Sequence, residues 1–345
     1  MNDIIACRLQ DYCQDRFQCK DDVRIYNLEN ITAGWESEVY AFSLEHGQPS
    51  NRVRDELILR LYSGEGAGDK CAHEFLSLQR LHQVGYPVPQ VHVLEHESSP
   101  FGKPFIIMER INGQVMWAQL DTANETVRAE LIASFCKLFA RLHQLDWRLF
   151  VEKAEQLRFY DPYACVDEWF GTARNFLEQH PDSGFRAVVE WLEDRRALVP
   201  CQKPSPTHND FHPNNVLVQN DNSSVVIDWT GFQISDARFD LAWTLVLADA
   251  YMGSTWREII LREYEHFSGE SVGALDCFIM FACVRRLFDV TASLLYGAEK
   301  MGLRADAVTS IRKNKVAHER VYRLLLERTD LRIREVDEML LSLNS

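Results

Sequence analysis

Apolar residues follow two different patterns along the chain, and the change falls near residue 110. The first part shows apolar runs of strand length, at residues 56–62, 88–94 and 104–111. A helical lead-in precedes them, and a helical spacing of apolar residues separates the first two runs. The pair Asn112-Gly113 is a turn signal. We therefore place a domain boundary here, with one domain over residues 1–110 and a second over residues 111–345.

Helical spacing dominates the second part. Residues 126–145 carry apolar side chains on one helical face, and from Ala237 to the end the pattern is almost wholly helical. Between them lies a small β region, in which two apolar runs, 216–218 and 225–227, flank a polar turn. This arrangement predicts a hairpin. The coarse prediction is a small, mostly β domain followed by a large, mostly α domain.

Composition narrows the class of protein. The chain has 345 residues, 46% of them hydrophobic and 26% charged, which suits a well-cored protein of about two domains. Its formal net charge is −14 and it has no block of five basic residues, so we expect no nucleic-acid partner. Neither a membrane span nor a secretory signal is visible, and the nine cysteines form no C-x-x-C pair. We expect a cytoplasmic protein with reduced thiols and without a zinc site.

Polar residues gather around the predicted hairpin. Asp210 lies on the loop that leads into it, Asn215 opens its first strand, and Asp228 closes its second. Because the two strands of a hairpin lie side by side, we expect Asn215 and Asp228 to come close together. Carboxylate and amide oxygens in this number suit Mg²⁺. A polar hairpin rich in turn-forming residues is the alternative, but the spacing is too specific to favour it.

These residues also carry a family resemblance. The run His208-Asn209-Asp210-Phe211-His212-Pro213-Asn214-Asn215, followed by Ile227-Asp228-Trp229, resembles the core of the aminoglycoside phosphotransferase and choline kinase family. Residues 235–242 match a later signature of that family, and the resemblance covers roughly residues 30 to 250. It implies an α+β, bilobal, protein-kinase-like fold, with a small mostly-β N-lobe that binds nucleotide and a large mostly-α C-lobe.

The resemblance also implies roles for individual residues. Asp210 would accept the proton of a substrate hydroxyl, while Asn215 and Asp228 would hold Mg²⁺ across the phosphates of ATP or GTP. His208 would brace the loop. The residues expected to bind nucleotide lie on a phosphate loop, a strand, a helix and the lobe connection, and are Gly34, Ser37, Arg60, Glu74, Glu109 and Ile111.

The sequence departs from the family at two positions. Arg60 stands on the strand where such kinases usually place a phosphate-binding lysine; it could pair with Glu74, or it could be a surface arginine on an edge strand. Asn209 stands where the small-molecule kinases commonly have glycine, and Asn tolerates a left-handed backbone better than most residues. We assign structural roles to Asp236 and Asp240, with Asp240 near a helix N-terminus.

The leading hypothesis is an ATP- or GTP-dependent O-phosphotransferase that acts on a hydroxyl of a small molecule. Residues 161–196 carry an excess of carboxylates, which indicates either a solvated helix face or a wall for an amine-bearing acceptor. Two alternatives stay open: an atypical serine/threonine protein kinase, and a nucleotide-binding pseudokinase that acts as a regulator. Arg60 favours the pseudokinase weakly.

Overall fold

The computed structural model describes residues 2–16, 23–31, 37–48, 51–64, 66–97, 99–297 and 307–343. Contacts divide the chain into two compact units. The first contains the described residues of Met1–Gln114 together with Leu217–Thr230. The second contains those of Val115–Val216, Gly231–Met301 and Ala305–Ser345.

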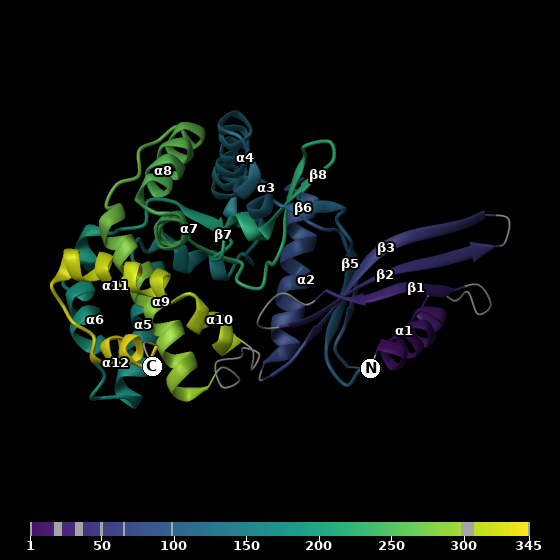
Figure 1. Cartoon of the computed structure of the whole chain (residues 1–345), viewed down its shortest axis with the longest axis horizontal. Helices are drawn as coiled ribbons and strands as arrows, with labels where there is room; N and C mark the ends of the chain where they lie inside the picture. The colour runs from purple at the N-terminus through teal and green to yellow at the C-terminus, as the bar shows by residue number, and fades with distance from the viewer. Residues whose placement is uncertain are drawn as a thin grey trace. The chain divides into compact units, whose positions relative to one another are not determined.

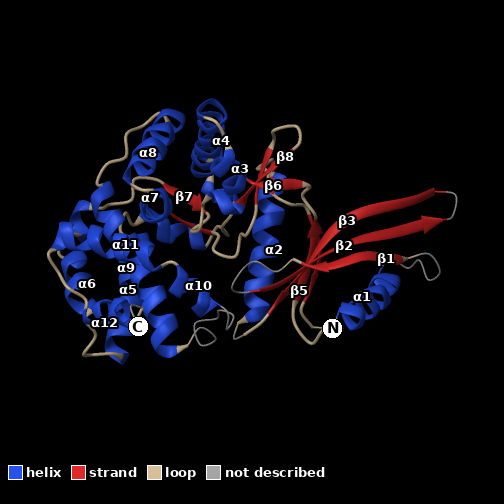
Figure 2. Cartoon of the chain, viewed as in Figure 1, coloured by secondary structure: helices blue, strands red, loops and turns tan. Residues whose placement is uncertain are grey.

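An antiparallel five-stranded sheet forms the first unit, in the order β1-β2-β3-β5-β4 (Figure 2). Its strands are β1 (Arg24–Asn30), β2 (Ser37–Gln48), β3 (Asn51–Tyr62), β4 (Val91–Glu95) and β5 (Phe105–Glu109). Two helices, α1 (Asn2–Arg16) and α2 (Ala67–Gln83), belong to the same unit. One face of the sheet is a buried apolar layer that contains Phe42, Leu59 and Phe105, together with Leu9 of α1. The predicted apolar runs overlap three of these strands: 56–62 is the C-terminal half of β3, 88–94 begins before β4 and covers most of it, and 104–111 contains the whole of β5.

Strands β2 and β3 form a long ribbon. They pair over their full lengths, from Ser37 opposite Tyr62 to Gln48 opposite Asn51. Strand β5, however, pairs only with Leu57 to Leu61 of β3. Over residues 51–55, β3 therefore has no strand on its other side within the described part of the chain, and the ribbon projects from the sheet (Figure 1).

The predicted hairpin is present and returns the chain to the first unit. Strands β8 (Val216–Gln219) and β9 (Ser224–Val226) form a three-stranded sheet with β6 (Gly113–Val115), in the order β6-β8-β9. A Cβ atom on Gly113 would lie 2.8 Å from the Val218 carbonyl oxygen, so only glycine allows this approach. The chain thus passes from the first unit to the second near residue 114, returns to the first for residues 217–230, and then passes to the second again. The prediction of one boundary at residue 110 does not include this return.

The second unit is mostly helical. Its helices are α3 (Met116–Thr122), α4 (Glu125–Gln144), α5 (Ala164–Gln179), α6 (Phe185–Glu193), α7 (Ala237–Met252), α8 (Ser254–Ser268), α9 (Leu275–Tyr296), α10 (Ala307–Lys313), α11 (Lys315–Thr329) and α12 (Arg334–Ser342). A two-stranded sheet of β7 (Pro204–Thr207) and β10 (Gln233–Asp236) accompanies them. Helix α7 is buried over most of its length and packs against α8, α9 and α11 (Figure 1). Among the described residues, no helix is both long and apolar enough to cross a bilayer.

Candidate functional site

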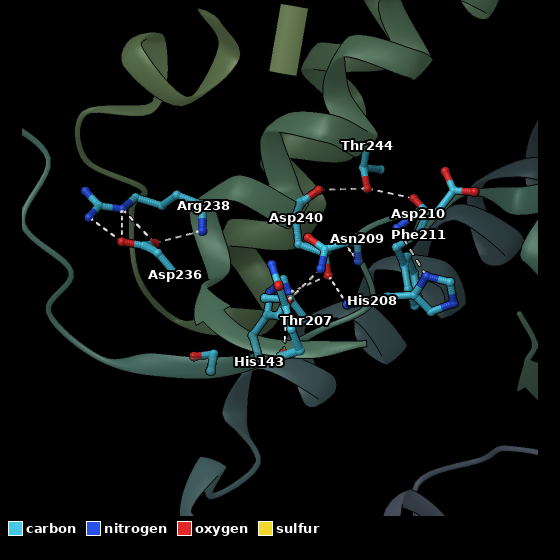
Figure 3. Close-up of polar contacts among 12 residues, drawn as sticks. His143, Thr207, His208, Asn209, Asp210, Phe211, Asp236, Arg238, Asp240 and Thr244 are labelled. Carbon is cyan, nitrogen blue, oxygen red and sulfur yellow. Dashed lines mark hydrogen bonds and ion pairs between the residues drawn. The ribbon is translucent and has the colours of Figure 1, made fainter. Parts of the chain in front are cut away.

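A buried carboxylate fixes the backbone at the start of the loop formed by residues 208–215, here called the Asp210 loop. Asp240, on the first turn of α7, is fully buried and accepts hydrogen bonds from the backbone N–H groups of His208 (2.6 Å) and Asn209 (2.9 Å) (Figure 3). His143 of α4 lies 3.3 Å from the same carboxylate. A buried charge is tolerable when several donors surround it, and here those donors belong to the loop that carries Asp210.

The position of Asp240 corrects one prediction. We expected Asp240 to satisfy free N–H groups at the start of α7, but Asp236 does this instead, because its side chain caps the helix and accepts from the backbone N–H of Arg238 at 2.9 Å. Asp240 lies one turn further along and points to the Asp210 loop. Its role is still structural, but it orders the loop rather than the helix.

The Asp210 carboxylate is held from several directions. The indole N–H of Trp243 donates to its Oδ1 at 2.8 Å, and His212 Nε2 lies 3.3 Å from its Oδ2. The Asn215 amide donates to the backbone carbonyl of Asp210 at 3.0 Å. Desolvation would by itself raise the pKa of the Asp210 carboxyl, but His212, the Trp243 hydrogen bond and the charge of Arg285 hold that pKa well below its usual range. Asp210 is therefore ionised at neutral pH.

The expected left-handed residue is found at Asn209. Its φ is 63°, in the region that Asn adopts more readily than most residues. Its side-chain amide also donates to the Gly231 carbonyl at 2.7 Å, a bond that glycine could not make. His208 is fully buried, and its Nδ1 accepts from the backbone N–H of Asp210 at 3.2 Å. This geometry supports the bracing role that the sequence suggested for His208.

A second group of polar residues belongs to the first unit and centres on Arg60. The Arg60 side chain is 9% exposed and makes three hydrogen bonds: Nε to Ser37 Oγ (2.9 Å), Nη1 to Glu74 Oε1 (2.9 Å) and Nη2 to Asp228 Oδ1 (2.8 Å). The alternative of a surface arginine on an edge strand is wrong, because β3 lies between β2 and β5 at this position. The structure therefore brings together four residues that the sequence predicts for the site. They are Ser37 of β2, Arg60 of β3, Glu74 of α2 and Asp228 at the end of the hairpin.

Burial and charge act against each other in this group. Burial would lower the pKa of the Arg60 guanidinium, but Asp228 and Glu74 together raise that pKa well above its usual value. Burial also raises the pKa of Glu74, and Arg60 opposes this shift. Glu74 Oε1 further accepts from the backbone N–H of Trp229 at 3.3 Å, and the Tyr62 hydroxyl donates to Glu74 Oε2. One guanidinium thus balances two carboxylates in a largely buried network.

The remaining predicted residues lie elsewhere. Gly34 is outside the described residues. Glu109 ends β5, is exposed, and accepts from the backbone N–H of Gln90 at 3.2 Å; Ile111 follows it and is half-buried. Asn215 lies with Asp210 in the second unit, and Asp228 lies with Arg60 in the first.

Sequence reasoning missed two residues near Asp210. These residues are Trp243, whose helical pattern alone indicates a core position, and Arg285. The signal for Trp243 was its spacing, since it follows Asp240 by three residues and so lies on the same side of α7. Arg285 lies 42 residues beyond Trp243 and has no local signal, because only tertiary packing brings it to the loop.

Comparisons with known proteins identify the family. The profile of the phosphotransferase enzyme family matches residues 27–275. The chain belongs to this family, and it is a kinase-type phosphotransferase with a hydroxyl group as acceptor. The fold class and the family expected from the sequence are both confirmed. No curated protein matches the sequence.

Solved structures agree on the fold. One is a Ralstonia eutropha JMP134 protein assigned to the aminoglycoside phosphotransferases, with a TM-score of 0.66 at 15% identity over 93% of this chain and 98% of that one. Another is an aminoglycoside phosphotransferase APH(2″) in complex with GDP and kanamycin, with a TM-score of 0.56 at 18% identity over 88% and 98%. A third is a thermostable mutant of APH(4)-Ia with ADP and hygromycin B, with a TM-score of 0.56 at 15% identity over 92% and 97%.

Proposed function

We propose that this protein transfers the γ-phosphoryl group of ATP or GTP to a hydroxyl of a small molecule. The observation that carries the proposal is the arrangement around Asp210, whose carboxylate is ionised, 44% exposed and fixed at one oxygen by Trp243. Such a carboxylate can accept a hydrogen bond from an acceptor hydroxyl and orient its oxygen toward the phosphorus. It can take the proton as the new O–P bond forms and the bond from the γ-phosphorus to the leaving nucleoside diphosphate breaks. Structures of family relatives with GDP and ADP support a nucleotide donor.

We propose that the nucleotide is bound by the six residues that the sequence predicts for this role. Three of them belong to the group around Arg60, namely Arg60, Ser37 and Glu74, and the other three are Gly34, Glu109 and Ile111. Arg60 would hold phosphate oxygens through charge-assisted hydrogen bonds, and Glu74 would keep its guanidinium in place. In phosphoryl transfer, positioning of this kind and electrostatic stabilisation supply most of the catalysis.

Asn215 and Asp228 have the donor atoms that Mg²⁺ prefers. The Asn215 amide nitrogen is engaged by the Asp210 carbonyl, which leaves its Oδ1 as the atom for a ligand, and the Asp228 carboxylate is 37% exposed. Within the described ranges, no group of three or more His, Cys, Asp or Glu side chains could hold a metal. Asn215 and Asp228 would each offer an oxygen to a Mg²⁺ ion that also binds phosphate oxygens, and the ion would neutralise charge on the transferred group.

The chemistry of the acceptor is less defined. Two of the solved structures are complexes with kanamycin and hygromycin B, and a wall for an amine-bearing acceptor is one of the two interpretations of the acidic segment 161–196. Three carboxylates of this segment, however, pair with arginines: Asp167 with Arg196, Glu168 with Arg158 and Glu193 with Arg174. These pairs favour a solvated surface for the segment.

A transfer screen tests the function. Wild-type protein with Mg²⁺ and γ-labelled ATP or GTP is offered aminoglycosides, choline, homoserine, sugars and protein substrates, and we expect labelled product with a small-molecule class. Asp210→Asn keeps the shape and removes the charge, so transfer should fall by about 10²- to 10⁴-fold while nucleotide affinity in calorimetry stays unchanged. Near wild-type turnover in this variant would exclude Asp210 as the base.

The same calorimetry tests the metal ligands, and the transfer screen separates the proposed function from a protein kinase and a pseudokinase. Asp228→Ala should abolish the tightening of ATP binding by Mg²⁺, and an unchanged Mg²⁺ dependence would overturn the ligand assignment. Labelled protein substrates alone would indicate a protein kinase. Nucleotide binding with neither transfer nor hydrolysis would indicate a pseudokinase.

A further inference from the structure

An arginine stacks on the tryptophan that contacts Asp210. Trp243 lies on α7 and Arg285 on α9, and the two helices pack together. The Arg285 guanidinium carbon is 3.9 Å from the centroid of the Trp243 ring, close enough for a cation–π interaction. Both side chains also donate a hydrogen bond to the Asp210 loop. Trp243 Nε1 donates to Asp210 Oδ1 at 2.8 Å, and Arg285 Nη1 donates to the Asn209 carbonyl at 2.9 Å.

The indole N–H of Trp243 donates to a carboxylate, although a tryptophan in the core does not require a charged acceptor. A buried indole N–H requires a hydrogen-bond partner, but any backbone carbonyl will serve. Trp229, which is fully buried, illustrates this, since its indole donates to the Val226 carbonyl at 2.9 Å. Trp243 is only 5% exposed, yet its indole reaches the one carboxylate of the loop.

We propose that Trp243 is a positioning residue for Asp210, and that Arg285 fixes Trp243 and the loop backbone together. The inference rests on the proposed function, because it assigns a role within the same reaction. Trp243 occupies Oδ1 and so restricts rotation of the carboxylate. Oδ2 lies near His212 (3.3 Å) and the Asn215 amide (3.4 Å), so the carboxylate is held at both oxygens, and a lone pair that these donors do not use can accept from an acceptor hydroxyl.

Arg285 contributes from the backbone side. Its bond to the Asn209 carbonyl fixes the peptide that leads into Asp210, and Asn209 is already held in the left-handed region. Asp289, one turn along α9, lies 3.8 Å from the Arg285 Nε and orients the guanidinium. One stacked pair thus contacts both the carboxylate and the peptide that precedes it. Small errors in the placement of a reacting group are costly, since about 1 Å can change a rate by 10²-fold.

Kinetics of Trp243→Phe test the role. Phenylalanine keeps an aromatic face for Arg285 but has no N–H, so we expect kcat to fall by about 10- to 100-fold with the KM for nucleotide unchanged. Arg285→Leu should give a similar split between kcat and KM, and Arg285→Lys should restore part of kcat, because lysine returns the charge without the planar fork. Unchanged kcat in Trp243→Phe would overturn the inference.

A second stacked pair supplies the control. Arg195 lies 3.7 Å above the ring of Trp191 on α6 and donates to the Trp191 carbonyl, in contacts that do not involve the Asp210 loop. Trp191→Phe and Arg195→Leu should leave kcat unchanged. Equal losses of kcat in both pairs would show a general effect of packing and overturn a specific role for Trp243.

An indole NMR signal tests the contact without turnover. The Trp243 indole ¹H–¹⁵N resonance is assigned by its disappearance in Trp243→Phe, and it should shift in Asp210→Asn, while the Trp191 resonance should not. Absence of a shift would overturn the contact. If wild-type protein transfers phosphate to no acceptor, the proposed function fails and this inference with it; an active wild type with a fully active Trp243→Phe overturns this inference alone.

Discussion

Arg60 is one of the two positions at which the sequence departs from the pattern of the family that it resembles. Its guanidinium reaches Ser37, Glu74 and Asp228 with three directed bonds, and a lysine ammonium on a flexible stem would not reproduce that planar geometry. Arginine is also weakly hydrated for a charged group, which suits a side chain that is 9% exposed. The substitution thus makes one side chain a structural link as well as the candidate phosphate anchor.

Removal of Arg60 should therefore affect both folding and turnover. Arg60→Ala leaves the buried Glu74 carboxylate without its cation, and we expect a loss of about 3–5 kcal/mol in the free energy of unfolding, together with a large loss of transfer. Arg60→Lys should recover part of each loss. Urea unfolding and steady-state kinetics measure the two effects.

Arg54→Ala is the matched control for Arg60, since Arg54 is on the same strand but is half-exposed and pairs with Glu56 at the surface. It should change stability by less than about 1 kcal/mol. If Arg60→Ala is no more destabilising than Arg54→Ala, the buried network contributes nothing and our reading of Arg60 fails.

Helix α7 connects local sequence signals with the site. Asp236 caps the helix, a role that any Asp before an apolar helix predicts. Asp240, four residues later, could not be assigned from the sequence, because its partners are backbone N–H groups 31 and 32 residues away. Spacing identifies which residues share a helix face, but it does not identify what that face meets.

Asp240→Asn should loosen the Asp210 loop. An amide in place of the carboxylate removes the charge that accepts from His208 and Asn209, and we expect a loss of about 2 kcal/mol in stability and a larger relative loss of turnover. Hydrogen exchange of the two amides should become faster. Asp236→Asn is the control, because Asn caps helices as well as Asp does and the loop is not involved. Equal protection of the two amides in Asp240→Asn and the wild type would contradict the assignment.

Strands with a continuous apolar run could be predicted from the sequence, whereas strands without one could not. The inner strands and the hairpin were visible because buried strands need continuous apolar runs. The β7–β10 sheet was not, since β7 reads Pro204-Ser205-Pro206-Thr207, with neither alternation nor β-forming residues. Prolines are tolerated there because β10 is the one strand with which β7 pairs among the described residues. The motif around Asp210 was predictable from spacing, whereas its supports on α7 and α9 depended on packing.

The pH dependence of overall stability should show the burial of His318 on α11. This side chain is fully buried, and desolvation, with a smaller effect from Arg286, lowers its pKa to about 4. The unfolded chain would bind a proton near the ordinary value of 6.5, so the unfolded state holds more protons between those values. The free energy of unfolding is therefore highest, as far as His318 determines it, above about pH 6.5. It should fall by about 3 kcal/mol as the pH is lowered from 6.5 to 4.

Denaturant unfolding at a series of pH values measures this loss. His318→Gln, which does not titrate, should be less stable at neutral pH but should lose less stability between pH 6.5 and 4 than the wild type. Parallel pH profiles for the two proteins would show that His318 does not supply the linkage.

The ribbon of β2 and β3 has a consequence for self-association. A strand with an open side is a template on which another chain can add by main-chain pairing, and such edges lead to aggregation. The open part of β3 carries Arg52, Arg54 and Asp55, and Arg52 and Asp55 bridge to Glu45 and His46 on β2. An incoming strand would have to desolvate these charges. The ribbon can thus extend beyond its sheet without becoming a nucleus for polymer growth.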